Sequence, residues 1–406
     1  MAGGDTATTF RASMALLATR RFGTFWFASL LSNIGTWAQQ VAQPWLMLTL
    51  SGSAFLVGLD AFAMDAPVWL LTLLGGVLAD RRDRRWIIFG FQSVQMLCPT
   101  LLVVLVLTGA VQPWMIIALS VVVGVTDALS MPSFASIVPS LVEKEQIGTA
   151  IALNSTQFNL SRILGPALAG VLLAGAGAAW CFGVSAASYV PFILVALWAL
   201  PSAPPKHDGP RPPLFSGIGE IVRQPALRGA LLTVFITAAL CSPLITFCPV
   251  LVKDAFQAGA GSFSGAIAAF GVGGVLGATV LLGIEGRFER RTLSTRAGAV
   301  YGLLVLCAAL TPWLWSLPVV LVFAGVAMAM SNTQANSVLQ TVAGPTLRGQ
   351  AASMLMLAMR GGMSTGSLVT GVTVEAMGVR QALLVNGALA VVLHLSLGRK
   401  WRAAPL

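Results

Sequence analysis

The feature that most constrains this chain is a series of long apolar runs, each of about 20 residues, the length that crosses a bilayer as a helix. We place twelve such runs, over residues 22–48, 54–79, 86–108, 113–138, 148–174, 178–200, 227–252, 259–283, 294–312, 315–341, 350–374 and 379–398. Only 9% of the residues are charged, too few to cover a water-soluble protein of 406 residues. The runs do not alternate in polarity as the strands of a membrane barrel would. We therefore predict an all-α integral membrane protein with 12 transmembrane helices.

The basic residues are divided unevenly between the two ends of these spans. With the N-terminus in the cytoplasm, the outside loops hold Lys253 and Arg380, the spans hold Arg162 and Arg360, and the other 20 of the 24 Lys and Arg lie on the cytoplasmic side. This bias is the positive-inside pattern. It predicts a multi-pass protein of a bacterial-type cytoplasmic (inner) membrane with both termini in the cytoplasm. A lipid bilayer thus explains the net charge of +10, and no nucleic-acid partner is expected.

A Pro-rich, charged stretch interrupts the series after the sixth run. It divides the chain into an N-terminal six-helix bundle (residues 1–200), a cytoplasmic linker (201–226) and a C-terminal six-helix bundle (227–406). The later part of the linker, Leu214–Arg223, is expected to form a short amphipathic helix on the membrane surface.

The second half of the chain resembles the first. One constant shift places four glycines of the first half over four of the second: Gly148, Gly165, Gly170 and Gly177 over Gly349, Gly366, Gly371 and Gly378. Two halves in the same orientation form a parallel repeat, which is a transporter architecture. We expect two pseudo-symmetric six-helix bundles that rock about a midplane site and open a central cavity to each side in turn.

The loop after the second run, "GGVLADRRDRR", resembles the loop signature of the major facilitator superfamily. The matching residues are Gly76, Leu78, Ala79, Asp80, Arg81, Arg84, Arg85 and Ile88, and Asp83 stands where the pattern has Gly. Three further stretches, around residues 32–53, 132–170 and 332–354, resemble the enterobactin-exporter-like branch, also called transmembrane secretion effectors. The resemblance implies export of siderophores, drugs or other amphipathic small molecules, usually driven by proton influx, without naming the substrate.

The same loop is a candidate conformational gate made of Gly76, Asp80, Arg81, Arg84 and Arg85. The helix dipole disfavours a carboxylate at the C-terminal end of its own helix. Asp80 is therefore expected to interact with Arg84 or with the N-terminus of the eleventh helix. We predict that this contact closes the cytoplasmic side and breaks when the cavity turns inward.

The fifth run carries "SRILGPALAG", which is similar to the antiporter signature of the superfamily. Gly165, Pro166 and Gly170 match that signature, and Ser161 and Ala169 replace two of its glycines. Both replacements are small, so close helix packing is expected to survive.

Five charged residues fall within the spans: Asp60, Asp65, Asp127, Arg162 and Arg360. Charges inside a bilayer are costly, by about 2.5–3.5 kcal/mol on insertion scales, and are candidates for function. We predict that protonation of Asp127 or Asp65 is the coupling step, with Arg162 as the counter-charge of Asp127. The alternatives are a static ion pair, an Asp capped by Ser or Thr, an outer-vestibule position for Asp60, and a buried partner rather than a cavity role for Arg360.

Polar residues recur at helical spacing on two further spans. Asn33, Thr36 and Gln40 share a face of the first, and Asn332 and Asn336 share a face of the tenth. Such stripes either line an aqueous cavity or hydrogen-bond neighbouring helices together.

Signals for an enzyme are lacking, because the sequence has no HExxH, GxSxG or GxxxxGK[ST] motif. We expect no metal and no cofactor, with the proton gradient as the energy source. The leading prediction is a monomeric, proton-coupled exporter of amphipathic small molecules. The alternatives are a proton-coupled importer of a polar nutrient and a non-transporting membrane receptor or scaffold.

Overall fold

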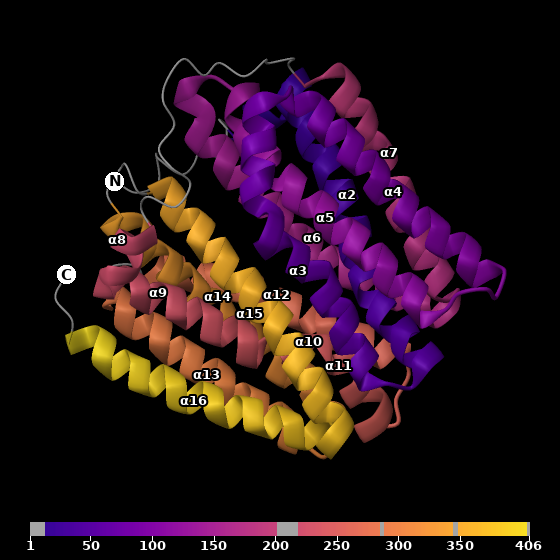
Figure 1. Ribbon diagram of the computed structural model, residues 1–406, viewed down its shortest axis with the longest axis vertical. Coiled ribbons are helices and arrows are strands. Elements are labelled where there is room, and N and C mark those ends of the chain that lie inside the picture. The colour runs from indigo at the N-terminus through magenta and orange to yellow at the C-terminus, as the bar shows by residue number, and fades with distance from the viewer. Residues whose placement is uncertain (1–12, 201–217, 285–287, 344–347, 404–406) are drawn as a thin grey trace. The chain divides into compact units, whose positions relative to one another are not determined.

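The computed structural model describes residues 13–200, 218–284, 288–343 and 348–403, and these residues form helices and no strand (Figure 1). Six long helices lie in the first half: α2 (Arg20–Ser51), α3 (Ala54–Arg81), α4 (Arg84–Leu107), α5 (Pro113–Ile137), α6 (Ile147–Gly175) and α7 (Ala178–Trp198). The second half holds α9 (Pro225–Ile236), α12 (Ala260–Ile284), α13 (Arg290–Leu310), α14 (Ser316–Val342), α15 (Arg348–Met377) and α16 (Val379–Ala403). The predicted all-α fold is confirmed.

Ten helical stretches of the described chain are long and apolar enough to cross a membrane. Helices α2 and α15, of 32 and 30 residues, coincide with the remaining two predicted spans and are long enough at about 1.5 Å per residue. The described part of the linker contains a short helix, α8 (Ile218–Arg223), within the predicted amphipathic segment. The rest of that segment lies outside the described residues.

The seventh span is not one regular helix. After α9 the chain makes a π-helical turn, η3 (Thr237–Cys241), two short helices, α10 (Pro243–Thr246) and α11 (Cys248–Val250), and a second π-helical turn, η4 (Leu251–Ala255). Proline lacks the backbone N–H that a helix needs, and Pro243 and Pro249 stand at these breaks. The span as a whole still covers Pro225–Ala255.

The chain folds into two compact units. Unit 1 comprises residues 1–43, 70–111 and 121–209, and unit 2 comprises residues 44–69, 112–120 and 210–406. The boundary runs through α2, α3 and α5, so that part of each of these helices belongs to unit 2. The predicted division of the chain at a linker of residues 201–226 stays a prediction.

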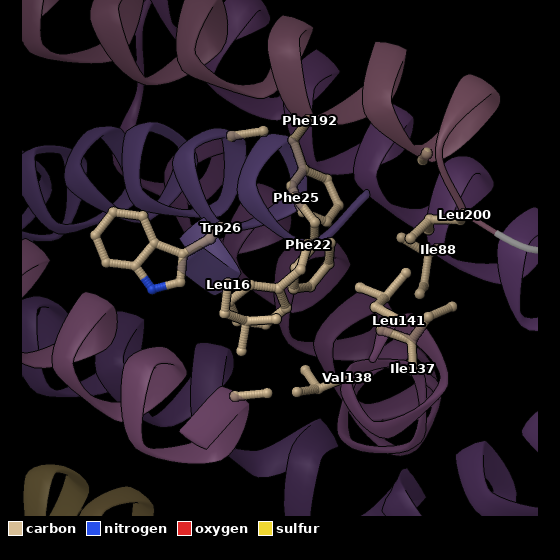
Figure 2. Packing of buried hydrophobic residues seen from close by; sticks show 13 residues of the cluster. Leu16, Phe22, Phe25, Trp26, Ile88, Ile137, Val138, Leu141, Phe192 and Leu200 are labelled. Atoms are coloured by element: carbon tan, nitrogen blue, oxygen red, sulfur yellow. The ribbon is translucent and has the colours of Figure 1, made fainter. Parts of the chain in front are cut away.

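Unit 1 has an aromatic and aliphatic core near the start of α2. Phe22 and Phe25 of α2 point into this core, and the Phe25 and Phe192 rings lie 5.7 Å apart between centroids (Figure 2). The neighbouring Trp26 donates its indole N–H to the backbone oxygen of Leu153 on α6 at 2.8 Å. One face of α2 is therefore fixed against α6 and α7.

In unit 2, α13 packs between α14 and α16, and α12 packs along α14 (Figure 1). Small residues allow this close packing. A Cβ atom on Gly273 of α12 would lie 1.9 Å from the backbone oxygen of Val322 on α14. Helix α15 packs against α9 and η3, where Gly366 lies against the backbone of Ala239.

The internal repeat is visible in the backbone. Gly177 has φ of +88° in the turn before α7, and its counterpart Gly378 has φ of +87° in the turn before α16. Glycine adopts this conformation without steric cost, which explains its presence at both sites. Gly165 and its counterpart Gly366 also make equivalent contacts, the first with α2 and the second with η3 at the seventh span. The predicted equivalence of the halves is confirmed at these positions.

Candidate functional site

Asp65 and Arg360 form an ion pair in unit 2. The Nη1 atom of Arg360 on α15 lies 2.5 Å from Oδ1 of Asp65 on α3 and donates a hydrogen bond to it. The Asp65 side chain is 9% exposed and that of Arg360 is 23% exposed. Asp65 lies eleven residues from the start of α3, about 16 Å along the axis, which is half the thickness of a bilayer core. The pair therefore joins two helices at mid-span depth.

The ion pair belongs to a longer contact between α3 and α15, which we call the α3–α15 seam. Ser53 meets Glu375 at one end, Gly58 meets Gly371 further along, and Asp65 meets Arg360 deeper still. Residue numbers rise on α3 as they fall on α15, so the two helices run antiparallel and side by side over several turns.

The middle of the seam has no room for a side chain. A Cβ atom on Gly58 would lie 2.5 Å from the backbone oxygen of Ser367 and 3.1 Å from Cα of Gly371. A Cβ atom on Gly371 would lie 3.3 Å from Cα of Gly58. Facing glycines thus bring the two backbones into direct contact, as small residues do in other membrane helix pairs.

A carboxylate lies at the Ser53 end of the seam. Oε2 of Glu375 accepts hydrogen bonds from the Ser53 hydroxyl and from the backbone N–H of Phe55, each at 3.2 Å. The first N–H groups of a helix have no partner within it. Glu375 on α15 thus caps the first turn of α3, and its negative charge is favourable at the positive end of that helix.

The other two carboxylates within the spans have hydrogen-bond donors of a different kind. The Ser120 hydroxyl donates to Asp60 at 2.5 Å in unit 2, and Asp60 is buried. The Gln95 amide donates to Asp127 at 2.5 Å in unit 1. Both donors are neutral side chains that also carry an acceptor atom, unlike a guanidinium group.

Arg162, the predicted counter-charge of Asp127, lies over an aromatic ring. Its guanidinium carbon is 5.4 Å from the centroid of Trp37 on α2. A cation over the face of an indole is attracted by the negative face of the ring. The pairing of Asp127 with Arg162 and their role in coupling stay predictions.

The residues of the two polar stripes differ in their contacts and in their burial. Thr36 lies 3.1 Å from the Tyr189 hydroxyl of α7, so this residue links two helices of unit 1. Asn33, Gln40 and Asn332 are partly buried, and Asn336 is exposed. Thr36 thus fits the hydrogen-bonding alternative, while a cavity role for the other four stays a prediction.

The loop after α3 is described in part. Nothing is described of the side chains of Asp80 and Arg81 or of the surroundings of Gly76, so the predicted contact of Asp80 with its gate partners lies outside the described residues. Arg84 is partly buried, and Arg85 donates a hydrogen bond to the backbone oxygen of Leu197 on α7. The neighbouring Gly75 makes a close helix contact, since a Cβ atom there would lie 2.3 Å from the backbone oxygen of Ala128.

Asp83, the departure from the loop signature, has a clear structural role. It is the N-cap of α4, and its side chain accepts a hydrogen bond from the backbone N–H of Arg85 at 3.0 Å. Aspartate and glycine are both accepted at helix N-caps, which explains how one replaces the other here.

The antiporter-type motif on α6 packs tightly against α2. A Cβ atom on Gly165 would lie 2.4 Å from Cβ of Trp37 and 2.9 Å from the backbone oxygen of Ile34. Ser161 and Pro166 are buried and Gly170 is partly buried. The close packing expected of this motif is present, and its part in antiport stays a prediction. Among the described residues, no group of three His, Cys, Asp or Glu could hold a metal ion.

The repeated six-helix halves and the ion pair at mid-span depth define a membrane protein of the major facilitator fold. The chain matches the transmembrane secretion effector family over residues 11–403, and it therefore belongs to that family of the major facilitator superfamily. This is a family of membrane transporters and not of enzymes.

Two curated relatives are similar in sequence over part of their length. The staphyloferrin A transporter of Staphylococcus aureus is 29% identical over 174 residues, which are 43% of this chain and 44% of that protein. The enterobactin exporter EntS of Shigella boydii serotype 4 is 27% identical over 274 residues, which are 66% of this chain and 64% of that protein. The matches thus span less than two thirds of either relative.

Solved structures share the fold. A bacterial homologue of the human lysosomal transporter Spinster has a TM-score of 0.73 at 18% identity, with 96% of this chain and 98% of that chain covered. The nucleoside transporter NupG has a TM-score of 0.73 at 14% identity, with 95% and 100% covered. At these identities the likeness establishes the fold alone.

Sequence reasoning missed the α3–α15 seam. Gly371 stands out in the sequence as one of the repeated glycines, and Glu375 is a carboxylate one turn further along the same helix. Nothing local, however, indicates that these residues meet Gly58 and Ser53, which are more than 300 positions away. The signal lies in the tertiary register of two helices.

Proposed function

We propose that the protein is a secondary active transporter that exports an amphipathic small molecule, siderophore-like or drug-like, in exchange for protons. The family and the two curated relatives, which are named for staphyloferrin A and enterobactin, support transport of a siderophore-like compound. We further propose that the protein lies in a bacterial-type cytoplasmic membrane with both termini in the cytoplasm, because the distribution of basic residues favours that orientation. In this proposal the protein acts as a monomer and without cofactors.

The observation that carries the proposal is the Asp65–Arg360 ion pair. A protonated carboxyl group keeps its hydrogen bonds with a hydroxyl or an amide, since those groups can turn and accept. A guanidinium group has no acceptor, so protonation of Asp65 leaves the charge of Arg360 facing a neutral group. Uptake of a proton at Asp65 therefore weakens the α3–α15 seam.

The sign of the coupling between proton binding and substrate binding distinguishes an exporter by antiport from an importer by symport. In an antiporter the proton and the substrate do not travel together, so each must weaken the binding of the other, and by linkage the two effects are equal. The substrate is then bound by the form with ionised Asp65 and released when that group is protonated. An importer by symport requires the opposite sign, with the substrate bound more tightly at lower pH.

The test is transport by the purified protein in proteoliposomes with an imposed pH gradient, using enterobactin, staphyloferrin A and a cationic dye as probes. We expect the gradient to drive flux of at least one probe, with binding weakened as pH falls. The variant Asp65→Asn, which mimics the protonated carboxyl group, is expected to bind the probe more weakly than the wild type, without dependence on pH, and to lose its response to the gradient. Asp254→Asn, an exposed carboxylate outside the seam, is the matched control and should behave as the wild type.

Three results would point elsewhere. Binding that strengthens as pH falls would favour the importer. Gradient-driven flux that survives in Asp65→Asn but is lost in Asp127→Asn would move the coupling site to Asp127. Absence of flux for every probe, in a protein that is folded, would favour the receptor or scaffold.

A further inference from the structure

A groove of about 420 Å³ runs along the outside of unit 1, between the first turns of α2 and the end of α7. Its lining is formed by Arg20, Thr24, Phe27, Leu31, Pro191 and Val195, among others. The groove belongs to unit 1, and the Asp65–Arg360 ion pair belongs to unit 2.

The shape of the groove follows from the two faces of α2. Phe22 and Phe25 are buried in the core of unit 1 (Figure 2), whereas Phe27 and Leu31 are 53% and 50% exposed on another face. The segment before α2 turns at Ala18 and Thr19 and packs against Gly23 of α2, where a Cβ atom would lie 2.0 Å from the backbone oxygen of Leu17. The groove is thus bounded at one end by this turn and open along the apolar face.

The groove has a charged end and an apolar length. Arg20 stands at the start of α2, with Arg21 exposed beside it, and the first turn of the helix holds no acidic residue. From Arg20 to Leu31 is eleven residues, about 16 Å at 1.5 Å per residue. That length is close to half of a hydrocarbon core of about 30 Å, which is the depth of one leaflet.

We propose that this groove is a binding site for an anionic phospholipid of the cytoplasmic leaflet. The negatively charged phosphate of the headgroup would lie against Arg20 and Arg21. An acyl chain would extend along Phe27 and Leu31 toward the midplane of the bilayer. Basic residues at the membrane surface contribute attraction to anionic lipids, and basic pockets between transmembrane helices bind their headgroups. The apolar length and the basic end of the groove together favour a lipid over a free anion, because a free anion has no acyl chain to contact the apolar residues.

The experiment is native mass spectrometry of the full-length protein titrated with phosphatidylglycerol or with phosphatidylcholine that carries the same acyl chains. We expect the wild type to bind phosphatidylglycerol more tightly. Arg20→Gln should weaken phosphatidylglycerol about fivefold, the effect of about one basic residue at a membrane surface, and leave phosphatidylcholine unchanged. Arg399→Gln, an exposed arginine at the end of α16, is the matched control and should change neither.

A second variant tests the apolar part of the site. Phe27→Ala combined with Leu31→Ala should weaken both lipids by a similar factor, because the acyl chains are the same. The proposal is overturned if the wild type shows no preference between the headgroups, if Arg20→Gln behaves like Arg399→Gln, or if the apolar double variant leaves both affinities unchanged. None of these readouts depends on whether the protein transports a siderophore.

Discussion

Replacing Arg360 with methionine should destabilise the protein strongly, and a second change at Asp65 should reverse most of the loss. In the single variant Arg360→Met, the Asp65 carboxylate stays buried at 9% exposure and loses its guanidinium partner. Removing one partner of a buried ion pair costs about 3–5 kcal/mol, whereas replacing both with groups of similar size is often neutral. Because Arg360 is 23% exposed, we expect the lower end, about 3 kcal/mol.

The measurement is thermal unfolding in lipid nanodiscs, followed by tryptophan fluorescence. For a folding unit of 150–250 residues, about 1 kcal/mol corresponds to about 2–4 °C, so Arg360→Met should lower the midpoint by about 6–12 °C. The double variant Asp65→Asn/Arg360→Met should recover more than half of this loss. A double variant whose midpoint falls by the sum of the two single variants would show that the side chains do not interact, and would refute the reasoning.

Two further predictions concern backbone contacts. Gly58→Leu should force α3 away from α15, because a Cβ atom at this position would already lie 2.5 Å from a backbone oxygen. The measurement is disulfide cross-linking in a protein that carries Ser53→Cys and Glu375→Cys, and the yield of the cross-link should fall sharply when Gly58→Leu is added. Gly90→Leu, at a glycine with nothing within 4 Å, should leave that cross-linking unchanged, and equal yields in both variants would contradict the close contact. Asp83→Ala should lower the free energy of unfolding by about 1 kcal/mol, because the α4 cap is lost, and Asp83→Gly should lower it by only a few tenths of a kcal/mol. Chemical denaturation measures both values, and equal losses in the two variants would argue against capping.

The positions of the helices could be predicted from the sequence because the bilayer fixes their length and composition. The predicted run 54–79 becomes α3 (Ala54–Arg81), and the run 178–200 becomes α7 (Ala178–Trp198). The seventh span shows where this reasoning stops. Hydropathy detects an apolar stretch but not the backbone path within it, and the π-helical turns η3 and η4 leave the apolar character of the span unchanged.

The candidate site was less predictable, for a physical reason. Depth along a span follows from counting residues, so the sequence could place Asp65 and Asp127 near mid-depth. The partner of each carboxylate depends on how helices are rotated and which of them pack together. Matching depth on consecutive helices predicts Arg162 as a partner for Asp127, and this pairing stays a prediction. The partner of Asp65, in contrast, is Arg360, which lies 295 positions later in the chain.

The seam bears on the proposal that Asp65 is the coupling carboxylate. Depth alone ranks Asp65 and Asp127 equally, and burial alone favours Asp60 and Asp65. What distinguishes Asp65 in the described contacts is its ion pair with Arg360, a group that has no acceptor atom for a protonated carboxyl group. Under our proposal, a proton on Asp65 would act on a contact that holds two helices together, and Gly58, Gly371 and Glu375 continue that contact along the same helix pair. The ion pair at mid-span depth and the helix cap at Ser53 are in this way parts of one helix pair.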